Sequence, residues 1–152
     1  MRNLVVFVAS LLLGWTLSVS AYPAEFGSKE EAQALVAKAI AYTKEAGPDK
    51  AFAEFSDPKG KWADRDLYIF VIDHTGTRLA HGQNPKLVGK SMFEMVDVNG
   101  KAYGKEIWDT ASKGPGWVDY WFIDPITKKQ MPKTVYVEKS GDYVFGCGVY
   151  KR

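Results

Sequence analysis

A tyrosine and a lysine on two neighbouring predicted strands have the side chains best suited to chemistry in this chain, and that chemistry is anion binding. The segments 117–122 and 133–138 are rich in aromatic and β-branched residues, and a short polar turn joins them. In the antiparallel register that this turn favours, Tyr120 lies opposite Lys133 on one face of a sheet. A phenol and an ammonium there could hold an anion while their neighbours exclude water. In the alternative interpretation, Tyr120 packs in the core and Lys133 extends to solvent.

These two strands belong to a predicted antiparallel sheet of five strands. Each strand is bounded by turn-forming residues, and the first is apolar on both faces, which is typical of a strand inside a sheet. The last three strands are consecutive and form a meander, which is the simplest way to pair them. The five predicted strands are 66–73, 78–81, 117–122, 133–138 and 143–150.

Three helices are predicted beside this sheet. Ser28 and Glu31 have the spacing of a capping box, so a helix should begin there and continue until Gly47. A short helix should follow over residues 48–55, and a third over residues 102–113. Helices that alternate irregularly with antiparallel strands indicate an α+β domain, in which the helices lie across the sheet.

The first 21 residues resemble a secretory signal peptide. Arg2 supplies a positive charge, residues 4–13 are apolar, and small residues precede a cleavage point after Ala21. We expect cleavage to leave a single domain of residues 22–152, located in the periplasm or secreted, with no stable membrane insertion. An uncleaved anchor is the alternative, although the apolar run is shorter than a membrane span of about 20 residues.

Composition excludes several classes of function. The 20 Lys and Arg residues and 18 Asp and Glu residues form no basic stripe, so we expect no nucleic-acid partner. The single Cys147 excludes an intrachain disulfide, and its glycine neighbours indicate a small buried residue. A catalytic alternative would pair Cys147 with His81 and Asp119, but no cysteine-hydrolase signature surrounds it. No metal, cofactor or catalytic motif is recognised, so we do not predict an enzyme.

A series of short motifs resembles the single Cache domain of the second type. The resemblance extends from the first predicted helix to the C-terminus, and it lies in the joint order and spacing of the motifs. In chain order the motifs are Asp66-Leu67-Tyr68-Ile69-Phe70-Val71, Asp73-His74-Thr75-Gly76, Ala80-His81-Gly82, Asn84-Pro85, Gly89-Lys90, Gly116-Trp117-Val118-Asp119-Tyr120, Pro132-Lys133, Tyr136-Val137 and Gly146-Cys147-Gly148-Val149-Tyr150.

The resemblance implies a PAS-like fold, in which a long N-terminal helix packs on a five-stranded antiparallel sheet. The other face of such a sheet, together with covering loops, encloses a small-molecule pocket. Domains of this family usually form the extracytoplasmic sensors of chemoreceptors and histidine kinases. Several of them bind short carboxylates such as acetate, propionate or pyruvate.

Carried over by position, the resemblance also implies which residues form the pocket wall. Lys133, Tyr120 and His81 are of the types that bind a carboxylate, and the aromatic residues would suit a short apolar tail. Trp121 would add to that tail site. For His81 the alternative is a histidine beside a turn that hydrogen-bonds to the backbone. The six implied wall residues are Tyr68, Phe70, His81, Trp117, Tyr120 and Lys133.

We therefore expect an exported, stand-alone sensor domain that binds a small organic anion. No kinase module, methyl-accepting module or second membrane segment follows in this sequence, so the expected signalling partner is a separate membrane receptor, kinase or transporter. The alternative is a protein-interaction module with a vestigial pocket that docks to a membrane sensor or transporter. The resemblance carries most of this functional expectation.

Overall fold

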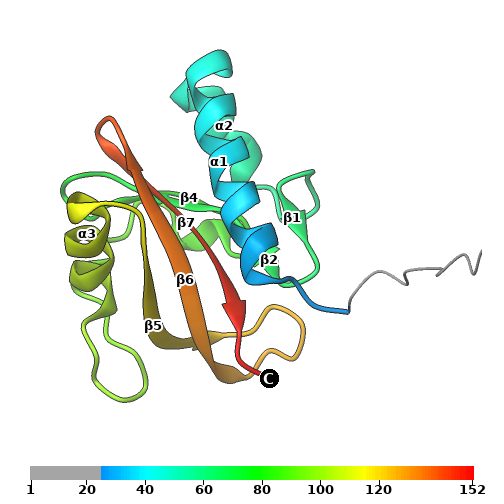
Figure 1. Cartoon of the computed structure of the whole chain (residues 1–152), viewed down its shortest axis with the longest axis vertical. Coiled ribbons are helices and arrows are strands. Elements are labelled where there is room, and N and C mark those ends of the chain that lie inside the picture. The colour runs from blue at the N-terminus through cyan, green and yellow to red at the C-terminus, as the bar shows by residue number, and fades with distance from the viewer. Residues whose placement is uncertain (1–24) are drawn as a thin grey trace, which may run out of the picture.

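The computed structural model describes residues 25–152, and their elements follow the order expected from the sequence (Figure 1). The predicted signal peptide lies outside the described residues and stays a prediction. The helices are α1 (Lys29–Ala46), α2 (Pro48–Phe55), the 3-10 helix η1 (Pro85–Leu87) and α3 (Tyr103–Lys113). The strands are β1 (Ala63–Asp64), β2 (Leu67–Tyr68), β3 (Phe70–Ile72), β4 (Arg78–His81), β5 (Gly116–Ile123), β6 (Gln130–Ser140) and β7 (Tyr143–Tyr150).

The long helix α1 begins at the predicted capping box. The Ser28 hydroxyl accepts from the Glu31 amide at 3.1 Å, and the Glu31 carboxylate accepts from the Ser28 amide at 2.7 Å. The helix ends at Gly47, whose φ of 85° is readily adopted only by glycine. Both ends of this helix are therefore set by local sequence.

The main sheet is antiparallel and has the strand order β4-β3-β7-β6-β5. Its register confirms the predicted pairing, because Tyr120 of β5 lies opposite Lys133 of β6. The predicted first strand is divided at Ile69. The segment before Ile69, β2, pairs with β1 in a separate two-stranded sheet, and β3 lies inside the main sheet between β4 and β7.

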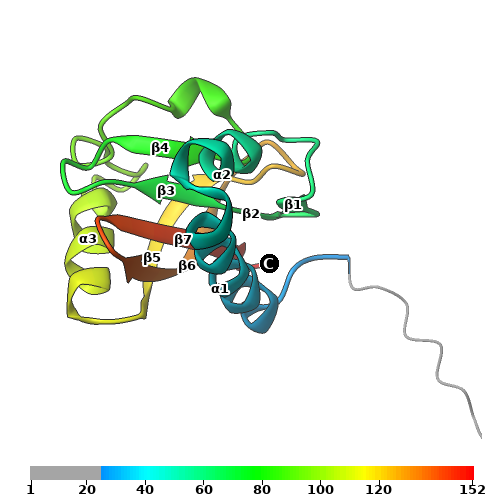
Figure 2. The ribbon, with the colours of Figure 1, turned by 90° about the horizontal axis from the view of Figure 1, so that it is seen from above.

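Helices cover both faces of the sheet (Figures 1 and 2). Helices α1 and α2 pack on one face through a core cluster that includes Val36, Phe55 and Phe145. Helix α3 packs on the other face through a cluster that includes Ile107 and Val135. Neighbouring residues of β7 alternate between these two clusters, as a pleated strand requires. Among residues 25–152, no helix is both long enough and apolar enough to cross a membrane.

Candidate functional site

A cavity of about 350 Å³ opens on the α3 side of the sheet, where the ends of β2, β4 and β5 meet two loops. Its wall combines aromatic and aliphatic side chains with a few polar groups, as small-molecule sites do, and its size is near the lower end of their range. The lining residues are Tyr68, His81, Gln83, Asn84, Leu87, Met95, Phe122, Ile123, Pro125 and Lys128.

Lys133 lies directly behind the Tyr68 part of this wall. Its ammonium donates to the Tyr68 hydroxyl at 2.8 Å, and the residue is 1% exposed, so it does not extend to solvent. Gly148 of β7 makes room for it, because a Cβ atom at this position would lie 2.6 Å from the Lys133 Cε. Burial lowers the pKa of Lys133 to about 7.

His81 is held by backbone groups and lines the cavity as well. Its Nδ1 accepts from the amides of Asn84 at 3.0 Å and Gln83 at 3.3 Å, as the backbone alternative anticipated. Its ring lies 4.9 Å from that of Tyr68 and 6.0 Å from that of Phe122, both in the cavity wall. The backbone interpretation is therefore confirmed, and a role of His81 in ligand binding stays a prediction.

The hydrogen bonds of His81 assign its proton. Burial, followed by the charges of Arg78 and Lys133, lowers the pKa of His81 well below its usual value. The ring is therefore neutral at neutral pH, and because Nδ1 accepts two hydrogen bonds, Nε2 carries the proton. His81 is thus a neutral hydrogen-bond donor in the cavity wall.

Arg78 is a second buried cation, which the sequence analysis did not identify. It is 1% exposed, and its Nη2 lies 3.5 Å from the sulfur of Met95, a residue of the cavity wall. Its Nε and Nη1 atoms have no hydrogen-bond partner among the described residues. A buried guanidinium with two unpaired nitrogens is costly, so such a group marks a place where an anion could bind.

A β-bulge explains how Arg78 and His81 come to share one face. Residues three apart on a regular strand point to opposite faces of a sheet. Here Val71 pairs with Ala80 whereas the next residue of β3, Ile72, pairs with Arg78. The extra residue in β4 turns Arg78 to the cavity side, and bulges often reorient a side chain in this way.

Two buried acids lie near these cations, but they are already paired. The carboxylates of Asp66 and Asp124 are 3.4 Å and 3.0 Å from the Arg152 guanidinium. Among residues 25–152, no carboxylate lies within ion-pair distance of Arg78 or Lys133. Arg78 and Lys133 therefore have no direct ion-pair partner among these residues, although Asp66 and Asp124 lie close enough to favour the charged form of Lys133.

Two other predicted residues lie on the cavity side of the sheet but deeper in the core. The ring of Tyr120 stacks on that of Tyr103, with centroids 4.2 Å apart, and Tyr120 is 5% exposed. Phe70 packs over Gly146, where an added Cβ would lie 2.2 Å from the ring. Neither residue lines this cavity, and Tyr120 instead lines, together with Lys133, a separate hollow of about 260 Å³.

The placement of Trp117 corrects the prediction, because Trp117 lies on the opposite face of the sheet. It packs with the cluster beneath α1, its ring is 5.4 Å from that of Tyr136, and the Lys29 ammonium lies over it at 4.8 Å. Trp117 and Tyr120 are three residues apart on a regular strand, so only one of them can face the cavity. Trp121 also points away from the cavity face and is 38% exposed. The aromatic residue of β5 that lines the cavity is Phe122, which was not predicted.

Cys147 is a buried residue of the core beneath α1. Burial raises its pKa to about 12, so it is a thiol rather than a thiolate at neutral pH. Asp119, its partner in the catalytic alternative, is exposed and bound to Lys151 at 2.7 Å. This arrangement does not activate the thiol. Among residues 25–152, no three His, Cys, Asp or Glu side chains are grouped so that they could hold a metal ion.

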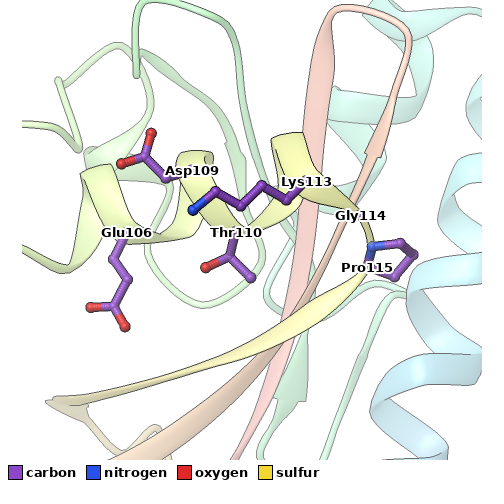
Figure 3. Close-up of a pocket in the computed structure, with 6 residues that line it drawn as sticks. All are labelled: Glu106, Asp109, Thr110, Lys113, Gly114 and Pro115. Atoms are coloured by element: carbon purple, nitrogen blue, oxygen red, sulfur yellow. The ribbon is translucent and has the colours of Figure 1, made fainter.

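A second hollow, of about 510 Å³, lies at the end of α3 (Figure 3). Its lining comes from the last two turns of the helix and the residues that follow, and none of it is buried. Glu106 in this hollow already pairs with Lys101 at 2.8 Å. It lacks the enclosed polar groups of the first cavity, so we regard the first cavity as the candidate site.

Comparisons with known proteins agree with this geometry. The family model described as Single Cache domain 2 matches residues 15–151. The chain is similar to the crystal structure of a methyl-accepting chemotaxis protein from Vibrio parahaemolyticus RIMD 2210633, with 26% identity and a TM-score of 0.71 over 80% of this chain and 87% of that one. A comparison with curated proteins found no match.

Two further structures have similar scores. One is described as the structural basis for carboxylic acid recognition by a Cache chemosensory domain, with 26% identity and a TM-score of 0.67 over 81% of this chain and 92% of that one. The other is the periplasmic sensor domain of a chemotaxis protein, with 25% identity and a TM-score of 0.63 over 81% and 90%. The chain therefore belongs to the single Cache domain 2 family, whose fold it shares with the sensor domains of chemotaxis receptors.

Proposed function

We propose that this protein is an exported, non-enzymatic sensor that binds a short organic anion, such as a small carboxylate, in the cavity beside Tyr68 and His81. The observation that carries the proposal is the pair of buried basic side chains, Arg78 and Lys133, which have no acidic partner within ion-pair distance among the described residues. An anion would supply the missing charge, and its binding would relieve the cost of burying these groups.

The neutral donors of the wall suit the same ligand. The Tyr68 hydroxyl and the His81 Nε2–H could donate to carboxylate oxygens, with the Lys133 ammonium one hydrogen bond behind. The apolar part of the wall, which includes Leu87, Met95 and Phe122, would accommodate a short hydrocarbon tail. Carboxylic acid recognition by a related Cache domain supports this ligand class.

We further propose that the domain is exported and acts with a separate membrane protein, such as a receptor, kinase or transporter. The predicted signal peptide supports export, and a related structure is a periplasmic sensor domain. Cleavage after Ala21 can be checked by N-terminal sequencing of the protein recovered from the periplasm. A mature chain that begins at Tyr22 is the expected result.

A thermal-shift screen of the chain against short carboxylates, amino acids, amines and purines would test the ligand class. A compound that binds only the folded state raises the unfolding midpoint in proportion to the logarithm of its excess over Kd. We expect a shift with a small carboxylate, and we expect the Lys133→Met and Arg78→Met variants to lose it. A shift with amines alone, or a carboxylate shift unchanged in both variants, would contradict the assignment.

One observation favours the second candidate function, a protein-interaction module. Large apolar side chains are exposed on β5, on the turn that follows it and on the loop before α3. The Asp97 carboxylate in that loop accepts from the Trp121 amide at 3.0 Å and so holds the loop against β5. Replacing Val96 and Val98, which do not line the cavity, with Lys would abolish binding to a membrane partner in a pull-down but leave carboxylate binding unchanged, if this surface docks. The exposed apolar residues of this region are Val96, Val98, Trp121, Ile123 and Ile126.

A further inference from the structure

We propose that the cavity takes up its anion together with a proton, which Lys133 accepts from solvent, so that one site responds both to the ligand and to pH. This inference rests on the proposed function, since it requires the cavity to bind an anion. It concerns the protonation state of Lys133, whose ammonium form the bound anion would stabilise.

The surroundings of Lys133 make a permanent charge there unfavourable. Its ammonium is enclosed by the rings of Tyr68, Tyr150 and Phe122, at 4.1, 4.9 and 5.6 Å from their centroids. Ring faces attract a cation weakly and do not replace a counter-ion. Its single polar contact given by the structure is the Tyr68 hydroxyl, which in turn lies 3.4 Å from the hydroxyl of Tyr150.

The groups that face Lys133 from the other elements do not compensate its charge. Burial raises the pKa values of the tyrosines and of the thiol, so these groups are neutral at neutral pH. His81 is neutral, Arg78 is a repelling cation, and both acids are held by Arg152. The titratable and charged groups around Lys133 are Asp66, Tyr68, Arg78, His81, Tyr120, Asp124, Cys147, Tyr150 and Arg152.

An anion in the cavity would change this balance. It would lie beside Tyr68, one hydrogen bond from the Lys133 nitrogen, and its negative charge would favour the ammonium form. Above pH 7 the ligand-free amine is largely neutral, so each anion that binds draws up to one proton from solvent onto this nitrogen. Affinity should fall by up to about tenfold per pH unit above pH 7, and it should be nearly constant below.

Calorimetry measures this proton directly. Propionate, pyruvate and succinate would be titrated into the chain at pH 6 and pH 8 in buffers that differ in ionisation enthalpy, and the buffer dependence of the heat gives the protons taken up per anion. We expect an uptake approaching one proton at pH 8 and much less at pH 6. Lys133→Met should bind more weakly and without buffer dependence. Lys129→Met, which removes an exposed lysine, should retain the uptake.

A second measurement follows the lysine directly, with and without ligand. In a carbon-13 NMR titration of the lysine Cε atoms, the resonance that is missing in Lys133→Met should titrate near pH 7 in the free protein and at a higher pH in saturating propionate. A midpoint near pH 10 in both states would overturn the inference, as would anion binding with no proton uptake. Absence of binding by all three anions between pH 6 and pH 9 would overturn the proposed function as well, and this distinguishes the two failures.

Discussion

Replacing Arg78 with methionine should make the ligand-free protein more stable while it weakens anion binding. Two of the three guanidinium nitrogens are buried without partners, and an unsatisfied buried polar group costs about 1–3 kcal/mol. Methionine keeps an unbranched apolar side chain in this place but removes the guanidinium and its charge, together with the contact of Nη2 with Met95. We therefore expect a net gain of about 1–3 kcal/mol, which corresponds to a rise of roughly 3–10 °C in Tm for a domain of this size.

The effect on the ligand has the opposite sign. A hydrogen bond to a charged group contributes about 1.5–3 kcal/mol, so loss of the Arg78 contact should weaken carboxylate binding by roughly 10- to 150-fold. Thermal unfolding without ligand and calorimetry with propionate would measure the two changes on the same preparation. The opposing signs distinguish a ligand-binding cation from a structural one.

Arg65→Met is the matched control for this prediction. It also removes one positive charge, but the Arg65 side chain is partly buried, pairs with Glu31 and Asp64 at 2.7 Å and donates to the Phe26 carbonyl. We expect a loss of stability instead of a gain, and unchanged propionate affinity. If Arg78→Met were less stable than the natural chain and bound propionate equally well, Arg78 would be a structural residue and our reasoning about the site would be refuted.

Three further predictions concern other parts of the site and core. Gly148→Ala should destabilise the fold by about 1–3 kcal/mol and weaken propionate binding, because the new Cβ would displace Lys133. Gly146→Ala is the control: it should also destabilise the fold, but the NMR titration of Lys133 should stay unchanged. Below pH 6.5 His81 is protonated in the unfolded chain but not in the folded chain, so the free energy of unfolding should fall by up to about 1.4 kcal/mol per pH unit as the pH is lowered. His81→Asn should lose this part of the pH dependence. An unchanged dependence of the unfolding free energy on pH in that variant, measured by calorimetry, would contradict the prediction. Cys147 should resist iodoacetamide at pH 8 in the folded protein and react fully in urea, as mass spectrometry would show; rapid labelling of the folded chain would contradict its burial.

Local sequence predicted much of the fold because local rules determine it. The capping box fixed the start of α1, and the length of the turn after Ile123 fixed the register that pairs Tyr120 with Lys133. The division of the predicted first strand at Ile69 could not be predicted, because it depends on pairing of β2 with β1, a partner that the pattern did not reveal. The same limit applies to all pairings between distant segments.

The two main errors in the site have different physical origins. Alternation along β5 alone would have excluded Trp117 from the face that carries Tyr120, but the family resemblance was carried over without this check. Arg78 could not have been found in this way. A regular strand would place it opposite to His81, and only the bulge in β4 brings both to the cavity side. Sequence patterns identify regular strands, so a residue placed by an irregularity is missed.

The features of the cavity that local rules did not predict are also the ones that lower stability. A bulge interrupts the pairing of β4, Gly148 of β7 lacks a side chain beside Lys133, and two basic side chains are buried with no acidic partner within ion-pair distance among the described residues. A chain selected for stability alone would fill this space with apolar residues, as the rest of the α3-side core does. Their concentration around one cavity is the physical basis of the proposed function. An anion bound there would satisfy the unpaired nitrogens of Arg78, so its binding would add to the stability of the folded state.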